Sequence, residues 1–258
     1  MNDTEILVTG GTGVLGSKVV ERLRSAGIEP RVLSHSGHPG AMKGDLLTGE
    51  GLEEAVRGID TIVHCASSPF RKARQTDVEG TKRLLEAAAR SGVSHVVYIS
   101  IVGIDRARSY PYYRVKLETE KVVEDSPIPH TILRATQFYD LVFMAVRALS
   151  RLPVVPVPRG LIGQPIDVGE VADRMVELAL SEPAGRVPDI GGPELRTVDD
   201  IVRSYLKVMG SRKRLMPFPL PGKTARAIRS GALTCPENRH GRITWEQFLG
   251  EELDRHPG

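Results

Sequence analysis

The sequence predicts an α/β fold: a doubly wound parallel sheet with helices on both faces, followed by a smaller C-terminal lobe. Through the first half of the chain, short apolar runs typical of buried strands alternate with segments of helical periodicity. A glycine-rich turn joins the first apolar run to the first helical segment. The second half is less regular, and the lobe is predicted there.

The elements of the first half follow in order from these patterns. Residues 5–9 form an apolar run that ends at glycines, which predicts a strand. A helix over 14–26 follows, because Val19, Val20 and Leu23 lie near helical spacing and Gly27 is a typical stop. Further strands are predicted at 31–34, 41–43, 61–65, 96–100 and 130–133, and helices at 52–56, 76–90 and 110–124. Right-handed crossovers favour the strand order 3-2-1-4-5-6.

The second half gives fewer signals. Residues 153–158 are rich in proline and predict an extended connector or an edge strand. Helices are predicted at 171–180 and 198–208, whereas the prolines between Pro217 and Pro221 predict a loop. Trp245 and Phe248 predict the docking face of a last helix, with a substrate or subunit contact as the alternative.

Composition narrows the class of protein. Of 258 residues, 40% are hydrophobic and 26% charged, which is typical of a globular chain. The net charge of +3 does not suggest a nucleic-acid binder. We interpret the densest basic run, Arg212 to Arg214, as an exposed loop cluster rather than a binding patch. The two cysteines, Cys65 and Cys235, do not indicate a disulfide framework and show no metal-binding spacing, so no metal is expected.

Targeting and membrane signals are also weak. No apolar stretch reaches the roughly 18 residues that span a bilayer, and the first residues show no secretory signal. We therefore expect a cytoplasmic protein, monomeric or homodimeric, with a small-molecule substrate and no nucleic-acid or membrane partner.

The turn after the first strand reads Gly10-Gly11-Thr12-Gly13-Val14-Leu15-Gly16 and satisfies two glycine spacings, Gly-x-Gly-x-x-Gly and Gly-x-x-Gly-x-x-Gly. Glycines let the backbone turn tightly, let a pyrophosphate approach it and let the helix pack on the strand. The helix N-terminus then offers free N–H groups and a positive dipole end to the phosphates. The turn predicts a Rossmann-type, dinucleotide-binding domain over residues 1–150, with a substrate-binding lobe over 151–258 that is interleaved with the main sheet.

The end of the second strand predicts which dinucleotide binds. NAD-binding folds usually place an acidic residue there, and this chain has Ser34-His35-Ser36, with Arg31 before and Lys43 beyond. A carboxylate would repel a 2′-phosphate, but hydroxyls and an imidazole would not. NADP(H) is therefore favoured over NAD(H), although a pocket that accepts both stays open. Asp45 and Leu46 are expected to close over the adenine.

These motifs resemble the short-chain dehydrogenase/reductase superfamily. Its extended and atypical branches share the glycine spacing, and the segments Gly44-Asp45-Leu46 and Asp77-Val78-Glu79-Gly80-Thr81 strengthen the match. Thr131-Ile132-Leu133-Arg134, with Phe138 after it, is most similar to the NmrA-like, NAD(P)H-binding group. The resemblance covers roughly residues 4 to 180. It implies either a reductase of small carbonyls or quinones, or a protein that binds NADP(H) without turnover and senses redox state.

The resemblance also implies an acid–base site. Tyr112 and Lys116 stand four apart on a predicted helix, and Ser100 ends the fifth strand. A lysine ammonium beside Tyr112 favours the phenolate, so Tyr112 can donate a proton to a carbonyl oxygen as hydride arrives. Ser100 can stabilise the same oxygen, and Lys116 can hold the nicotinamide ribose. Tyr113 is an alternative phenol, and both tyrosines could instead serve packing.

Two further loops are assigned to the cofactor by topology. Ala66, Ser67 and Ser68 follow the fourth strand and should pass the ribose, while Ala135, Thr136 and Phe138 follow the sixth and should flank the nicotinamide. His64 is interpreted as a core histidine with satisfied hydrogen bonds. Asp167 and Glu170 are interpreted as capping residues.

The leading hypothesis is an NADP(H)-dependent oxidoreductase that transfers hydride to a small carbonyl or quinone-like substrate. The alternatives are a non-catalytic NADP(H)-binding redox sensor and, with less support, a nucleotide-sugar epimerase.

Overall fold

The computed structural model describes residues 4–35, 37–69 and 72–255. The chain separates into two units, each assembled from several segments. Unit 1 contains Met1–Ser100, Pro111–Arg134 and Val171–Pro188, and unit 2 contains Ile101–Tyr110, Ala135–Glu170 and Asp189–Gly258. Residues 135–150 therefore belong to unit 2 and not to unit 1.

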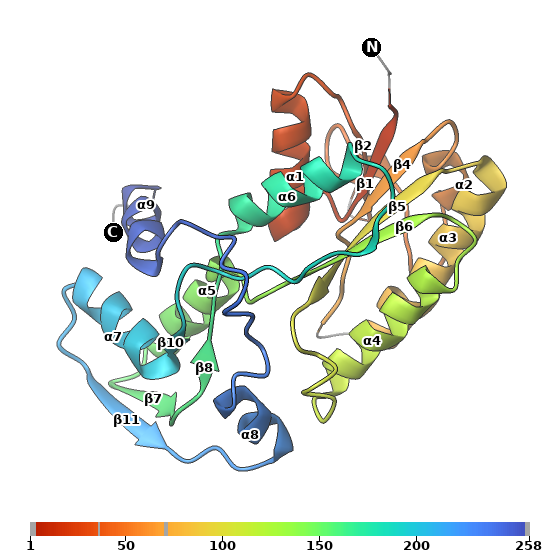
Figure 1. The fold of residues 1–258 in the computed structure, drawn as a ribbon. Coiled ribbons are helices and arrows are strands. Elements are labelled where there is room, and N and C mark those ends of the chain that lie inside the picture. The colour runs from red at the N-terminus through yellow and green to blue at the C-terminus, as the bar shows by residue number, and fades with distance from the viewer. Residues whose placement is uncertain (1–3, 36, 70–71, 256–258) are drawn as a thin grey trace. The chain divides into compact units, whose positions relative to one another are not determined.

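Unit 1 is built on a seven-stranded sheet in the order β3-β2-β1-β4-β5-β6-β9, whose paired strands run parallel (Figure 1). The strands are β1 (Ile6–Thr9), β2 (Arg31–Ser34), β3 (Met42–Lys43), β4 (Thr61–His64), β5 (His95–Ile101), β6 (His130–Ala135) and β9 (Gly185–Arg186). The predicted order and the predicted doubly wound α/β fold are both confirmed. The seventh strand, β9, extends the sheet beyond the sequence-based expectation.

Helices cover both faces of this sheet, because each parallel crossover returns along one side (Figure 1). They are α1 (Val14–Ser25), α2 (Leu52–Ala55), a π-helix η1 (Arg74–Glu79) continued by α3 (Gly80–Ser91), and α4 (Pro111–Glu124). The helix α6 (Val168–Ala179) begins in unit 2 and continues in unit 1. Leucine, isoleucine, valine and alanine side chains from the strands and from α2 and α3 form the main core cluster. The carboxyl ends of the central strands lie at one edge of the sheet, which is where such folds bind ligands.

Two buried polar groups, the imidazole of His64 and the guanidinium of Arg134, have their hydrogen-bond partners inside unit 1. His64 is buried with Nδ1 2.6 Å from the hydroxyl of Thr9 and Nε2 2.8 Å from that of Thr81, so the interpretation as a satisfied core histidine is confirmed. Arg134, on β6, donates to both carboxylate oxygens of Glu120 on α4, at 2.7 and 2.5 Å.

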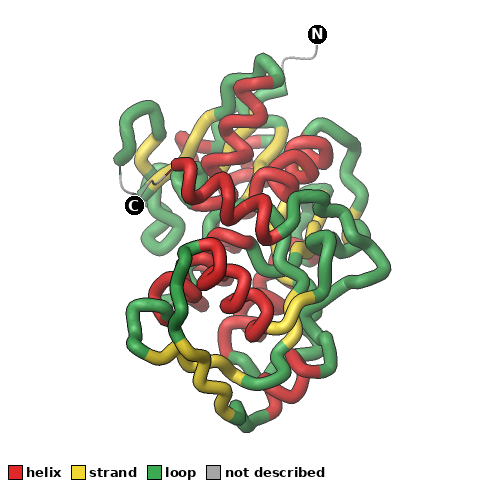
Figure 2. The backbone as a smooth tube through the Cα atoms, turned by 90° about the vertical axis from the view of Figure 1, so that its left-hand side faces the viewer, coloured by secondary structure: helices red, strands yellow, loops and turns green. Residues whose placement is uncertain are grey.

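Unit 2 contains two small sheets and several helices, and Figure 2 shows that helices and loops make up most of its length. Strand β7 (Val154–Pro158) pairs parallel with β11 (Arg214–Phe218), and β8 (Ile162–Gly163) pairs antiparallel with β10 (Arg196–Thr197). The helices are α5 (Tyr139–Leu149), α7 (Val198–Val208), α8 (Lys223–Arg229) and α9 (Trp245–Arg255).

The core of unit 2 contains a group of aromatic side chains among aliphatic ones. Trp245 and Phe248 of α9 are buried with ring centroids 5.5 Å apart, and Tyr139 of α5 packs against both. The predicted docking face of the last helix is therefore confirmed. The prediction of a loop from Pro217 is wrong at its start, because Pro217 and Phe218 lie in β11. Proline has no backbone N–H to donate, and a strand of a two-stranded ribbon tolerates that loss. Asp167 caps the start of α6 by accepting from the amides of Gly169 and Glu170.

Candidate cofactor and acid–base site

The glycine turn is closed by contacts that only glycine permits. Gly10 has φ +66°, and a Cβ there would lie 2.7 Å from the Cα of Ala66. A Cβ on Gly16 would lie 2.1 Å from the carbonyl oxygen of Gly10, and the amide of Gly13 donates to that oxygen at 2.9 Å. The turn therefore folds back on itself and packs against the loop after β4.

The opening of α1 faces outward above this turn. Thr12, Gly13 and Val14 are exposed, whereas Leu15 and Gly16 are buried. Gly13 is the N-cap residue and has no side chain to cap the first-turn amides, and that turn contains no acidic residue. Bare amides at a positive dipole end fit a doubly charged diphosphate. Residues 10–16 therefore fit the phosphate part of a dinucleotide.

The end of β2 lies beside the same turn. The hydroxyl of Ser34, which is buried, lies 3.4 Å from that of Thr12, so two residues expected at the cofactor are brought together. His35 is exposed, and Ser36 lies outside the described residues. No carboxylate occupies position 34 or 35, where an NAD-binding fold usually has one.

The cations expected near that strand have other partners. The guanidinium of Arg31 donates to the carbonyl oxygens of Ala55 and Arg57 at 2.9 and 2.8 Å, which satisfies the end of α2. Lys43 lies 3.7 Å from a carboxylate oxygen of Glu50, and both side chains are exposed. Arg31 thus has a structural role and is not held ready for a 2′-phosphate.

The pair Asp45 and Leu46 lies just beyond β3. The carboxylate of Asp45 accepts from the amide of Leu47 at 2.7 Å, which stabilises the local turn. Leu46 is buried in the main core cluster, against Gly80 at the start of α3. Its side chain therefore packs in the protein interior, and a contact of either residue with the adenine stays a prediction.

Tyr112, at the start of α4, is engaged with residues from two other segments. Its hydroxyl hydrogen-bonds with the hydroxyl of Ser67 and donates to Oδ2 of Asp77 at 3.2 Å. Asp77 also accepts from the amide of Ser68 at 2.8 Å. The carboxylate of Asp77 thus binds both the tyrosine expected in catalysis and the loop after β4, which is expected at the cofactor.

Lys116 lies one turn further along α4 and is buried. Its ammonium donates to the carbonyl oxygen of Ile99 at 3.0 Å and lies 4.3 Å from the centre of the Tyr98 ring. Burial lowers the pKa of Lys116 to about 8, and the negative charges of Asp77 and Glu120 oppose that fall. The lysine can therefore act as a cation at neutral pH while remaining close to losing its proton.

Ser100 supplies the third expected group. Its side chain is 3% exposed, and its hydroxyl oxygen has no hydrogen-bond partner within the described ranges. A buried hydroxyl without a partner is uncommon, because it forfeits a hydrogen bond it would make in water. Ser100 follows Ile99, the residue that accepts from Lys116, so the hydroxyl lies at the same strand end as the lysine.

Asp77 is the site residue that sequence reasoning missed. It was noted only as part of a family-like helix start, yet it is 2% exposed and contacts both Tyr112 and the loop after β4. It lies on the π-helix Arg74–Glu79, a form that is rare and frequently occurs at functional sites. Burial raises the pKa of Asp77, while Lys116 and the hydrogen bonds lower it. The segment Arg74–Glu79 is mostly polar, so no hydrophobic pattern singles Asp77 out in the sequence.

The residues expected after β6 belong to unit 2. Ala135 and Thr136 are buried there, and the hydroxyl of Thr136 donates to the carbonyl oxygen of Gln164 at 2.5 Å. Phe138 is the N-cap residue of α5 and is partly buried. Their expected position beside the nicotinamide stays a prediction.

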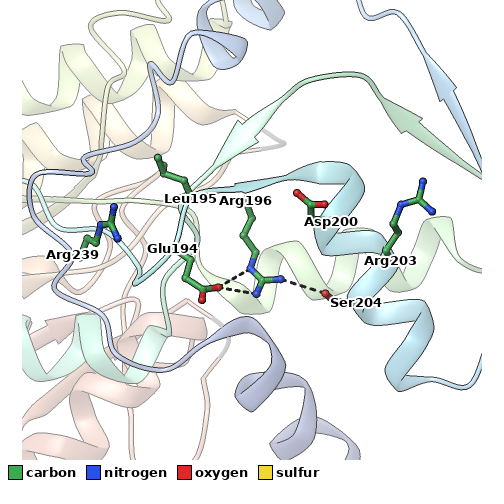
Figure 3. Close-up of a pocket in the computed structure, with 7 residues that line it drawn as sticks. All are labelled: Glu194, Leu195, Arg196, Asp200, Arg203, Ser204 and Arg239. Atoms are coloured by element: carbon green, nitrogen blue, oxygen red, sulfur yellow. Dashed lines mark hydrogen bonds and ion pairs between the residues drawn. The ribbon is translucent and has the colours of Figure 1, made fainter.

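Unit 2 also contains a pocket of about 630 Å³ (Figure 3). Arginines and acidic residues line it, but the charges are largely paired. Arg196 bonds Glu194 and, bidentately, Glu246, and Arg203 bonds Asp199. Figure 3 shows Arg196 reaching towards Glu194 and Ser204. An ion-pair network of this kind fixes the start of α7 and leaves little net field for a charged ligand.

Two further findings concern the part of the chain that the structure describes. No helix within the described residues is long and apolar enough to cross a membrane. Nor do those residues contain a group of three or more histidine, cysteine or acidic side chains that could hold a metal ion.

The chain is similar in sequence to known proteins. The profile of a family described as NAD(P)H-binding matches residues 10–182. The photosystem II assembly factor Ycf39 of Trieres chinensis is 25% identical over 264 residues, covering 96% of this chain and 83% of that protein. A (4-alkanoyl-5-oxo-2,5-dihydrofuran-3-yl)methyl phosphate reductase of Streptomyces griseus is 28% identical over 221 residues, covering 80% of this chain and 74% of that protein.

Solved structures share the fold. An NADPH-dependent quinone oxidoreductase of Escherichia coli, in complex with NADPH, matches with a TM-score of 0.80 at 17% identity, covering 96% of this chain and 99% of that one.

Proposed function

This chain belongs to the NAD(P)H-binding family, and from that premise we propose that it is an NADP(H)-dependent oxidoreductase that reduces a small carbonyl or quinone-like substrate. The observation that carries the proposal is that unit 1 has Tyr112 and Lys116 one turn apart on α4, with Lys116 bonded to Ile99, the neighbour of Ser100. This arrangement combines a phenol, a buried ammonium and a buried hydroxyl without a partner. The glycine turn of the same unit fits the diphosphate of the cofactor.

In this mechanism NADPH, when bound, supplies the hydride. Tyr112 donates its hydroxyl proton to the substrate oxygen, and Lys116 stabilises the phenolate that forms. Ser100 donates a hydrogen bond to the same oxygen, which offsets the cost of its unpaired burial. Asp77 holds the hydroxyl of Tyr112 in place before substrate binds. We assign substrate recognition to the C-terminal part of the chain, residues 151–258.

NADP(H) is the proposed cofactor, because Ser34 and His35 stand where a carboxylate would repel a 2′-phosphate. With Arg31 and Lys43 engaged elsewhere, the selectivity over NAD(H) that we propose is modest.

The test is a screen of quinones and carbonyls for NADPH oxidation by the purified full chain. Tyr112→Phe should lower turnover about 100-fold or more, the scale of lost general acid catalysis. Tyr113→Phe, the matched control on the neighbouring residue, should leave turnover within a few-fold. If Tyr113→Phe abolishes turnover and Tyr112→Phe does not, the assignment of the phenol is wrong.

A second candidate is a non-catalytic NADP(H)-binding regulator. The observation that favours it is the engagement of Tyr112 with both Asp77 and Ser67, which occupies the hydroxyl that catalysis needs. The similarity to a protein named as an assembly factor agrees with this candidate. Tight NADPH binding without oxidation by any screened substrate would select it.

A further inference from the structure

Two segments of unit 2 share an unusual charge pattern. Residues 151–159 and 209–220 contain five basic residues and no acidic ones: Arg151, Arg159, Arg212, Lys213 and Arg214. The whole chain, by contrast, is near balance, with 35 basic and 32 acidic residues. We call these two segments together the basic ribbon.

The fold brings the two halves of the basic ribbon together. Strands β7 and β11 pair in parallel over their full length, with Arg214 opposite Val154 and Met216 opposite Pro156 (Figure 1). The ammonium of Lys213 donates to the carbonyl oxygen of Ser150 at 2.6 Å, which ties the ends of the pair. The two segments that carry these charges are therefore neighbours, although Lys213 and Ser150 lie 63 positions apart in the sequence.

The same ribbon exposes apolar side chains. The structure describes eleven large hydrophobic residues as exposed, and five of them lie here, each between 37% and 53% exposed: Leu152, Val154, Met209, Met216 and Leu220. The pleat explains the pattern, because Val155 and Val157 face the core of unit 2 while Val154 and Met216 face outward beside Arg214. An outward face that is both apolar and basic costs hydrophobic free energy unless something covers it.

We propose that the basic ribbon is a peripheral docking surface for an anionic lipid bilayer. Apolar side chains that enter the headgroup boundary and cations that contact acidic headgroups are the two components of interfacial membrane binding. Charge complementarity favours an anionic surface, since no carboxylate interrupts the ribbon. This revises the interpretation of Arg212 to Arg214 as an exposed loop cluster, and it revises the expectation that the chain has no membrane partner.

Nucleic acid is the less suitable polyanion. Its binding surfaces combine cations with exposed aromatic rings that stack on bases. The one aromatic residue of the ribbon, Phe218, is only partly exposed, and the exposed apolar groups are aliphatic. Transfer of aliphatic side chains from water into lipid is favourable, whereas contact with nucleic-acid phosphates gives no such stabilisation.

The test is co-sedimentation of the full chain with vesicles of phosphatidylcholine alone or mixed with phosphatidylglycerol. The chain should sediment with the mixed vesicles only, and added salt should weaken binding. Arg212→Gln/Arg214→Gln should lower the partition coefficient about 30-fold, from the loss of two cations near the surface. Met216→Ser should lower it about 10-fold.

Matched controls carry the same changes elsewhere on exposed positions of unit 1: Arg57→Gln/Lys82→Gln for charge and Leu180→Ser for apolar area. They should bind as the wild type does, and NADPH affinity should be equal in all variants. Equal sedimentation of ribbon and control variants would overturn the proposal. So would binding to duplex DNA or RNA without binding to the mixed vesicles.

Discussion

The hydroxyl of Tyr112 donates to Oδ2 of Asp77 across 3.2 Å, although the two residues lie 35 positions apart. The π-helix Arg74–Glu79 and the start of α4 bring them together. Asp77 also lowers the cost of burying the ammonium of Lys116, because its negative charge raises the pKa of that group. One buried carboxylate thus positions the phenol and supports the cation on which the proposed reduction depends.

Asp77→Asn should move the alkaline limb of the pH profile of kcat/KM to lower pH. Burial lowers the pKa of Lys116 to about 8, and Asp77 opposes that fall. Without the carboxylate, Lys116 loses its proton at a lower pH, so the activity that needs the ammonium declines earlier as the pH rises. The measurement is NADPH oxidation across the range of the limb. The control is Asp125→Asn, which changes an exposed acidic residue just after α4. If the alkaline limbs of Asp77→Asn and the wild type coincide, the account is contradicted.

The stability of the fold should fall in acid because of His64. Burial, with a smaller contribution from Lys116, lowers the pKa of this ring from 6.5 to about 3. Below about pH 6.5 the unfolded chain binds a proton that the folded chain does not, so the free energy of unfolding decreases as the pH falls through this window. The decrease should reach up to about 5 kcal/mol. Urea unfolding at stepped pH measures it, and His64→Gln should show a shallower dependence; parallel curves would contradict the assignment.

Arg134→Met should lower the free energy of unfolding by about 3–5 kcal/mol, because it leaves the carboxylate of Glu120 buried without its partner. Arg134→Met/Glu120→Leu should regain most of that loss, since it removes the stranded charge. The control is Arg90→Met, whose ion pair with Glu53 is exposed and should contribute about 1 kcal/mol or less. Denaturant unfolding compares the variants, and a double variant no more stable than Arg134→Met would count against this reading.

Much of unit 1 could be predicted from the sequence. Its strands are buried on both faces and therefore read as continuous apolar runs, and Gly10 to Gly16 mark the first turn without ambiguity. Tyr112 and Ser67 were both named from the sequence, but their contact was not, because it depends on how the loop after β4 approaches α4. Asp77 carries no periodic signal, since a π-helix changes the register of the side chains around it.

Unit 2 was less predictable for a physical reason. Helix α5 is apolar on most of its circumference, with Leu141 and Met144 exposed and Val146 buried, so no helical stripe distinguishes it. Strand β11 contains Pro217, which normally argues against a strand and is accommodated only because β7 is its single partner.

The central claim is that the bare amides at the start of α1 hold the diphosphate of NADPH, and titration of Gly13→Val with NADPH tests it most directly. Gly13 has φ −83° and ψ 177°, which any residue can adopt, and it is exposed. A Cβ there would lie 3.2 Å from the carbonyl oxygen of Gly10, which a small local shift relieves, so valine should keep the fold while filling the space before the amides. Calorimetry should show NADPH binding by the wild type and a loss of about 100-fold or more in the variant, at a Tm lowered by no more than about 5 °C. Equal affinity in the two proteins would contradict the account.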